Sequence, residues 1–134
     1  MRSTDEQRKL ADLLAPYWSA PRTLQELGIT AGEMRQRLAD GSVLAVATYG
    51  GTLFFPIWQF ERHPDGGVEV KPGLITIMQT LRTVIEDGWM VGTLLRTPAP
   101  ELDDLTPEQW VDADREPATL DRYAAGLVRK GSRP

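Results

Sequence analysis

The sequence predicts an α+β fold that is mostly helical, and three observations predict it. Apolar residues recur every three or four positions along most of the 134 residues, which is the helical period. Capping-box patterns, in which Ser or Thr precedes Glu or Gln by three residues, come before several of these stretches. Two extended apolar runs, residues 43–49 and 52–55, flank the pair Gly50-Gly51, which predicts a β-hairpin with a two-residue turn.

The composition is that of an ordinary globular domain without thiol chemistry. Hydrophobic residues make up 41% and charged residues 25%, with a net charge of −4 and no cysteine. The missing cysteines exclude thiolate catalysis, iron–sulfur clusters and Cys-ligated zinc. No apolar run approaches the roughly 20 residues that cross a bilayer, and the polar N-terminus is unlike a signal peptide. We therefore expect a cytoplasmic protein without membrane contact.

Three helices and the hairpin are predicted in the N-terminal half. Capping boxes at Ser3, Thr23 and Thr30 predict the three helix starts, and Gly28 suits a left-handed turn between the second and third helices. Two short helices followed by a hairpin are the order of a winged helix–turn–helix, so we assign residues 1–60 to a lobe of this kind.

Residues 61–134 are expected to form a helical bundle. The segment from Glu61 to Lys71 is rich in Pro and Gly and predicts a loop between the two lobes. Helices are expected from Pro72, over residues 89–96, after Thr106 and from near Pro117. A core shared by the two lobes is expected around Phe54, Trp58, Phe60 and Trp89.

The third predicted helix is the candidate DNA reader. Thr30 at its N-cap and the side chains of Arg35, Gln36 and Arg37 are types that contact phosphates and base edges. Residues 1–60 hold six basic and six acidic residues, which gives little general attraction to phosphate. A helix–turn–helix that binds no DNA therefore stays open as the alternative.

No residue pattern typical of a catalytic site is visible. The single histidine, His63, stands beside Pro64 in a polar segment, and neither glycine pair precedes the Lys-Ser/Thr of a phosphate-binding loop. The neighbouring carboxylates of residues 101–121 are typical of a solvated surface. We expect no enzymatic activity, no cofactor and no metal.

The order of three motifs resembles a known family. The turn Leu27-Gly28-Ile29-Thr30, the Phe-Pro-x-x-Gln-Phe pattern of residues 55–60 and the two Thr-Pro pairs of residues 97–107 follow one another. This order is similar to the antitoxins of the Xre/MbcA/ParS toxin-binding family, over roughly residues 23–128. The resemblance implies a largely helical homodimer that caps the active site of a RES-domain toxin, which consumes NAD or transfers ADP-ribose. The toxin-binding residues it implies are Leu102, Asp104, Thr106, Trp110, Tyr123, Arg129 and Lys130.

Two functions follow as expectations. The first is an antitoxin-like protein that occludes a RES-type toxin and also represses its own operon by binding operator DNA. The alternative is an excisionase-type, sequence-specific DNA-binding regulator without a toxin partner, in which the C-terminal lobe serves dimerisation.

Overall fold

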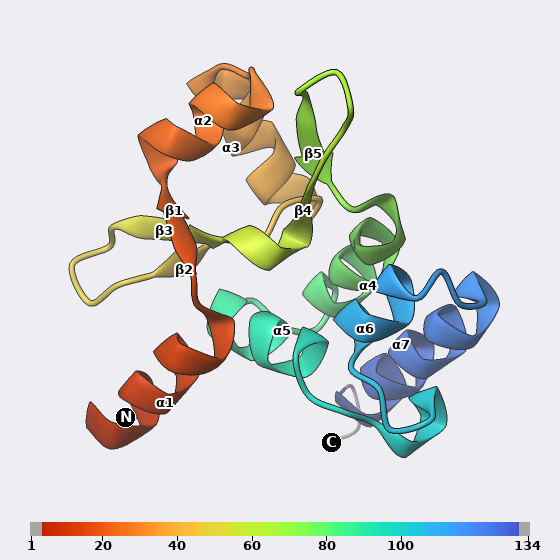
Figure 1. Cartoon of the computed structure of the whole chain (residues 1–134). Helices are drawn as coiled ribbons and strands as arrows, with labels where there is room; N and C mark the ends of the chain where they lie inside the picture. The colour runs from red at the N-terminus through yellow and green to blue at the C-terminus, as the bar shows by residue number, and fades with distance from the viewer. Residues whose placement is uncertain (1–3, 132–134) are drawn as a thin grey trace.

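The computed structural model describes residues 4–131, and the predicted capping box at Ser3 lies outside this range. Over the described residues the fold is α+β and mostly helical, as predicted, with seven α-helices and two small antiparallel sheets (Figure 1). The N-terminal half runs α1 (Thr4–Leu14), β1 (Tyr17–Ser19), α2 (Ala20–Leu27), α3 (Ala31–Asp40), β2 (Val46–Ala47) and β3 (Leu53–Pro56).

The C-terminal half is a set of short helices that begins after a second hairpin. Its elements are the 3₁₀ turn Ile57–Gln59, β4 (Phe60–Arg62), β5 (Val68–Val70), α4 (Pro72–Arg82), α5 (Gly88–Leu95), a second 3₁₀ turn Pro100–Leu102, α6 (Pro107–Asp112) and α7 (Pro117–Gly131). The helix starts expected at Pro72, Thr106 and Pro117 are confirmed. None of the helices between residues 4 and 131 is both long and apolar enough to cross a membrane.

The first sheet has the order β1-β3-β2, with β3 in the centre and both pairings antiparallel. Trp18 lies opposite Phe55, and Val46 lies opposite Phe54. Strand β1 was not predicted, because its three residues lie between Pro16 and Pro21 and become a strand only by pairing with β3. The sheet joins the end of α1 to the hairpin at the left of Figure 1.

Three local predictions need correction. Helix α2 begins at Ala20, not at Thr23, because the Ser19 side chain accepts a hydrogen bond from the Arg22 N–H and caps the helix earlier. Thr23 is buried inside the helix, and its hydroxyl donates to the Ser19 carbonyl at 2.7 Å. The β2–β3 turn has three residues, 49–51, because Thr48 pairs with Thr52 and only Gly51 takes a positive φ, of 85°.

The third correction concerns the segment expected to be a loop between the lobes. Strands β4 and β5 form a hairpin there, with Glu61 opposite Glu69, and the Lys71 N–H donates to the Gln59 carbonyl at its base. Leu14 near the N-terminus and Ala124 in α7 belong to one continuous core of buried apolar residues. The core therefore extends across the predicted boundary at residue 60.

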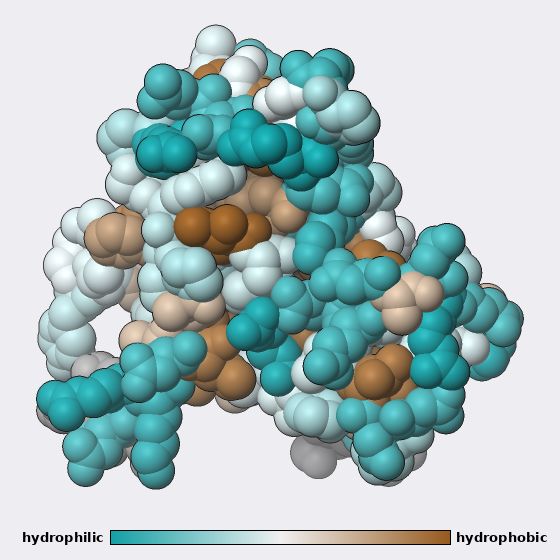
Figure 2. All heavy atoms as spheres, in the orientation of Figure 1, coloured by the Kyte–Doolittle hydropathy of each residue, from teal (hydrophilic) through white to brown (hydrophobic). Residues whose placement is uncertain are grey.

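Aromatic side chains and close helix approaches position the two halves. Trp58 and Phe60 are buried, as expected, and the Trp58 indole N–H donates to the Leu14 carbonyl at 3.0 Å. Helix α5 lies so close to α1 that a methyl group at Gly92 would stand 2.6 Å from a Leu14 methyl carbon. Hydrophilic side chains cover the outer side of α1, and hydrophobic ones appear where its C-terminal end meets the rest of the molecule (Figure 2).

Candidate nucleic-acid interface

Helices α2 and α3 are joined by a three-residue turn whose geometry is fixed at both ends. Gly28 ends α2 in the left-handed conformation, with φ of 67°, and its N–H donates to the Leu24 carbonyl. Thr30 begins α3 with the predicted capping box: its hydroxyl oxygen accepts from the Glu33 N–H, and the Glu33 carboxylate accepts from the Thr30 N–H. A short turn with a glycine between two helices is characteristic of helix–turn–helix units.

Helix α3 has one buried side and one polar, exposed side. Met34 packs into the core, whereas Arg35 and Gln36 are exposed and Arg37 is half-buried. The Arg35 guanidinium folds back over the first turn of the helix: a methyl group at Gly32 would stand 3.6 Å from Arg35 Nη2 and 3.8 Å from Thr30 Oγ1. The structure thus brings Thr30 and Arg35 together at the N-terminal end of α3, while Arg37 lies nearer its C-terminal end.

The two arginines of α3 keep their charges available. Within residues 4–131, no ion pair engages Arg35 or Arg37. The exposed end of the β2–β3 hairpin is different in chemistry, because residues 43–60 contain no charged side chain at all. Tyr49 at its tip is 83% exposed. Helix α3 therefore offers cations, and the tip of the β2–β3 hairpin offers an uncharged aromatic side chain.

A cluster of two arginines around Glu26 braces α2 from outside. The Glu26 carboxylate accepts from Arg62 of β4 at 2.7 Å and from Arg22 of α2 at 2.9 Å. The hydrogen bond from Arg62, together with that from Arg22, lowers the pKa of Glu26 below its ordinary value. The cluster ties α2 to the β4–β5 hairpin.

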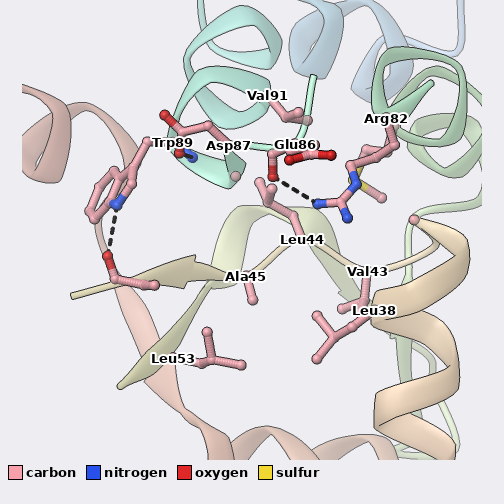
Figure 3. A pocket seen from close by; sticks show the side chains of 14 residues that line it. Leu38, Val43, Leu44, Ala45, Leu53, Arg82, Glu86, Asp87, Trp89 and Val91 are labelled. Atoms are coloured by element: carbon pink, nitrogen blue, oxygen red, sulfur yellow. Dashed lines mark hydrogen bonds between the residues drawn. The ribbon is translucent and has the colours of Figure 1, made fainter. Parts of the chain in front are cut away.

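A cavity of about 360 Å³ lies between the C-terminal end of α3, the base of the β2–β3 hairpin and the start of α5 (Figure 3). Its walls are mostly apolar, with Leu44 and Leu53 among them. Arg82 stands at the edge and donates to the Glu86 carbonyl at 3.2 Å. The Trp89 indole N–H donates to the Ala47 carbonyl at 2.9 Å, which ties α5 directly to strand β2.

The comparisons with known proteins concern the fold alone. Neither a family model nor a curated protein sequence matches this chain. The overall fold is similar to that in the NMR structure of Rv2175c. The TM-score is 0.53, with 21% sequence identity over 87% of this chain and 78% of the other. At this level of identity the similarity supports a common architecture and leaves the function to be argued from the residues themselves.

The predicted toxin-binding residues do not form one surface. Leu102, Thr106 and Trp110 are buried, with exposures of 0, 8 and 5%. Thr106 caps α6, and the Trp110 indole N–H donates to the Glu116 carbonyl at 2.8 Å, so their side chains serve the fold. Asp104 is exposed, in a left-handed turn with φ of 63°.

The other three predicted residues do come together. Tyr123, Arg129 and Lys130 line a groove of about 390 Å³ along α7, with Glu101 at its edge. Burial, and then the charge of Glu101, raises the pKa of Tyr123 above its ordinary value. No sequence pattern indicates that these three residues lie apart from Leu102 and Trp110, because the separation depends on how α6 and α7 pack.

Proposed function

We propose that this protein binds duplex DNA, with α2 and α3 as a helix–turn–helix and the β2–β3 hairpin as its wing. One observation carries the proposal: the order α1-β1-α2-α3-β2-β3, with the hairpin completing a β1-β3-β2 sheet against which α2 packs. This arrangement leaves the polar side of α3 exposed, while α2, which the short turn joins to α3, packs on β1 and β3. An exposed second helix of this kind fits the major groove of B-DNA.

The residue types on α3 support base and phosphate contacts. Arginine forms paired hydrogen bonds with guanine and glutamine with adenine, and Arg35 and Gln36 are the exposed members of the helix that can do so. Thr30 at the helix start is suited to a phosphate oxygen. In this proposal Tyr49 at the wing tip contacts the sugar–phosphate backbone by packing and through its hydroxyl.

The charge balance sets the expected strength. Each chain offers the two arginines of α3, and the lobe as a whole is neutral. Counterion release then gives a slope of log affinity against log salt of about −2 per chain, far shallower than that of a basic DNA-coating protein. Useful affinity requires two chains on a two-fold symmetric site, in line with the expected homodimer.

The test begins with selection of bound sequences from a random duplex pool, because the operator is unidentified. Fluorescence anisotropy with the selected duplex then compares variants at several salt concentrations. Arg35→Ala is expected to weaken binding by about 5- to 150-fold and to relax preference at one base position. Arg122→Ala, an exposed arginine of α7, is the matched control and should change affinity less than twofold.

Two results would remove the proposal. One is a pool that shows no enriched sequence after repeated selection. The other is an equal loss of affinity in the Arg35→Ala and Arg122→Ala variants, which would show attraction to charge in general.

A second proposal concerns the C-terminal half: we infer that the α7 groove binds a RES-domain toxin. The motif order supports it, and so does the gathering of Tyr123, Arg129 and Lys130 in one groove. Co-expression with a RES-domain toxin should restore growth and give a complex that co-purifies, and Tyr123→Ala should weaken that complex. Unchanged toxicity and no complex would reject this role without bearing on DNA binding.

A further inference from the structure

The β4–β5 hairpin carries a histidine and two carboxylates on one face. Glu61 and Glu69 lie directly opposite each other across the two strands, and His63 follows Glu61 by two residues, which returns it to the same face. One ligand atom from each of the three side chains lies within 4.8 Å of the other two. His63 Nε2 and Glu69 Oε1 are already 3.0 Å apart.

We propose that Glu61, His63 and Glu69 form a binding site for a divalent transition-metal ion, with Zn²⁺ as the expected occupant. Zinc bonds to imidazole nitrogen and carboxylate oxygen are each about 2.0–2.2 Å long, so two ligand atoms on one ion stand roughly 3–3.5 Å apart. The His63–Glu69 pair has this spacing already. Glu61 reaches it by a small rotation of a long, flexible side chain.

The chemistry of the three ligands selects the metal. Imidazole favours zinc, nickel and copper, whereas magnesium and calcium prefer sites built of oxygen alone. The two carboxylates carry two negative charges, which balance a divalent ion. The third ligand, imidazole, binds in its neutral form and does not change that balance. Three protein ligands leave a fourth position for water, because the His63 and Glu69 side chains are 42 and 47% exposed.

The hairpin itself supports the assignment in two ways. Like charges directly opposite each other destabilise an antiparallel pair, and a cation between Glu61 and Glu69 turns that repulsion into attraction. The turn is also fixed in advance: Gly66 takes a φ of 92°, and the Asp65 carboxylate accepts from the Gly67 N–H at 2.8 Å. A rigid turn reduces the entropy lost when the ligands close on an ion.

Metal binding at this place would act on α2. The strand residue between Glu61 and His63 is Arg62, on the opposite face, and its guanidinium donates to Glu26 of α2 at 2.7 Å. An ion that holds β4 to β5 therefore stiffens the hairpin that braces α2, and the loaded protein is expected to unfold at a higher temperature.

The experiment uses the full chain without a polyhistidine tag. Because the sequence holds a single histidine and no cysteine, any imidazole signal that responds to metal comes from His63. Calorimetric titration with zinc chloride is expected to give saturable binding of one ion per chain. The His63 imidazole resonances in the NMR spectrum should shift in parallel, a measurement that needs no variant.

Variants then identify the ligands. His63→Ala and Glu69→Gln are each expected to weaken zinc binding at least about tenfold, which corresponds to about 1.4 kcal/mol. Glu116→Gln, which removes one exposed carboxylate outside the cluster, should leave it unchanged within twofold. Zinc binding of equal strength in His63→Ala would overturn the proposal. So would a His63 resonance that stays in place at millimolar zinc, or that shifts equally with magnesium chloride.

Discussion

Gln59 is the buried polar side chain on which the start of the β2–β3 hairpin depends, and its replacement by leucine gives the sharpest test of the fold. The side chain is 0% exposed. Its amide oxygen accepts from the Leu44 N–H at 2.8 Å, and its amide nitrogen donates to the Leu44 and Pro56 carbonyls at 2.8 and 3.0 Å. The Gln59 amide thus makes the two hydrogen bonds to the Leu44 backbone that a neighbouring strand would otherwise make.

The expected loss follows from the groups left without partners. Gln59→Leu removes a partner from three groups, the Leu44 N–H and the Leu44 and Pro56 carbonyls. The two groups of Leu44 alone set the expected loss, because each buried unsatisfied group costs about 1–3 kcal/mol. The free energy of unfolding should therefore fall by about 2–6 kcal/mol, a large part of the roughly 5–15 kcal/mol typical of a domain. With a urea slope of about 2 kcal/mol/M, the unfolding midpoint should fall by about 1–3 M.

Urea unfolding followed by circular dichroism checks this, with Gln25→Leu as the control. Gln25 is exposed on α2, so the same chemical change there should cost less than about 0.5 kcal/mol. Gln59→Glu adds a second arm: its carboxylate can accept from Leu44 but cannot donate, so its loss should shrink at acidic pH, where the protonated carboxyl regains a donor. A Gln59→Leu variant as stable as the Gln25→Leu control would refute the reasoning.

Three further predictions concern stability and are all measured by chemical unfolding. Gly88→Ala should destabilise by at least about 2 kcal/mol, because the new methyl group would stand 2.1 Å from the Ala45 carbonyl oxygen; wild-type stability would contradict this. Gly126→Ala should stabilise by about 0.5–1 kcal/mol, since it lies inside α7 with space beside it. Glu26→Gln should destabilise at neutral pH but not well below pH 4.5, because a lowered folded-state pKa stabilises only while the carboxyl is ionised.

The parts of the fold that were predicted correctly are those that depend on residues close together in the sequence. The capping boxes at Thr30 and Thr106 and the left-handed turn at Gly28 need only a few consecutive side chains, and all three are present. The start of α2 was misplaced because Ser19 and Thr23 are both good caps. The pairing of β1 with β3 holds residues 17–19 in a strand, and α2 therefore begins after Ser19.

The missed elements depend on contacts between distant residues. Strands β4 and β5 have three residues each, too short for a periodic pattern, and they exist through their register with each other. The candidate metal ligands Glu61 and Glu69 meet only through that register, so their spacing along the chain does not predict a metal site. The burial of Leu102 and Trp110 likewise follows from the packing of α6 and α7.

The Phe-Pro-x-x-Gln-Phe segment shows how a family resemblance can rest on structural residues. Phe55, Gln59 and Phe60 are all buried, and Gln59 makes the hydrogen bonds described above. Residues 55–60 lead from the central strand β3 into β4, and this turn buries Phe55, Gln59 and Phe60. Packing accounts for these residues, so the segment by itself does not indicate a toxin partner.

The bond between the Trp89 indole and the Ala47 carbonyl gives the protein a built-in optical reporter. Indole emission responds to hydrogen bonding and to water. The Trp89 indole is hydrogen-bonded to β2, the strand that leads to the tip of the β2–β3 hairpin. Under the proposed DNA-binding function, displacement of the β2–β3 hairpin by a bound duplex should therefore change the Trp89 part of the fluorescence, measured as the difference between the protein and its Trp89→Phe variant. Stopped-flow mixing of the two proteins with duplex would then time any movement of this hairpin without an attached dye.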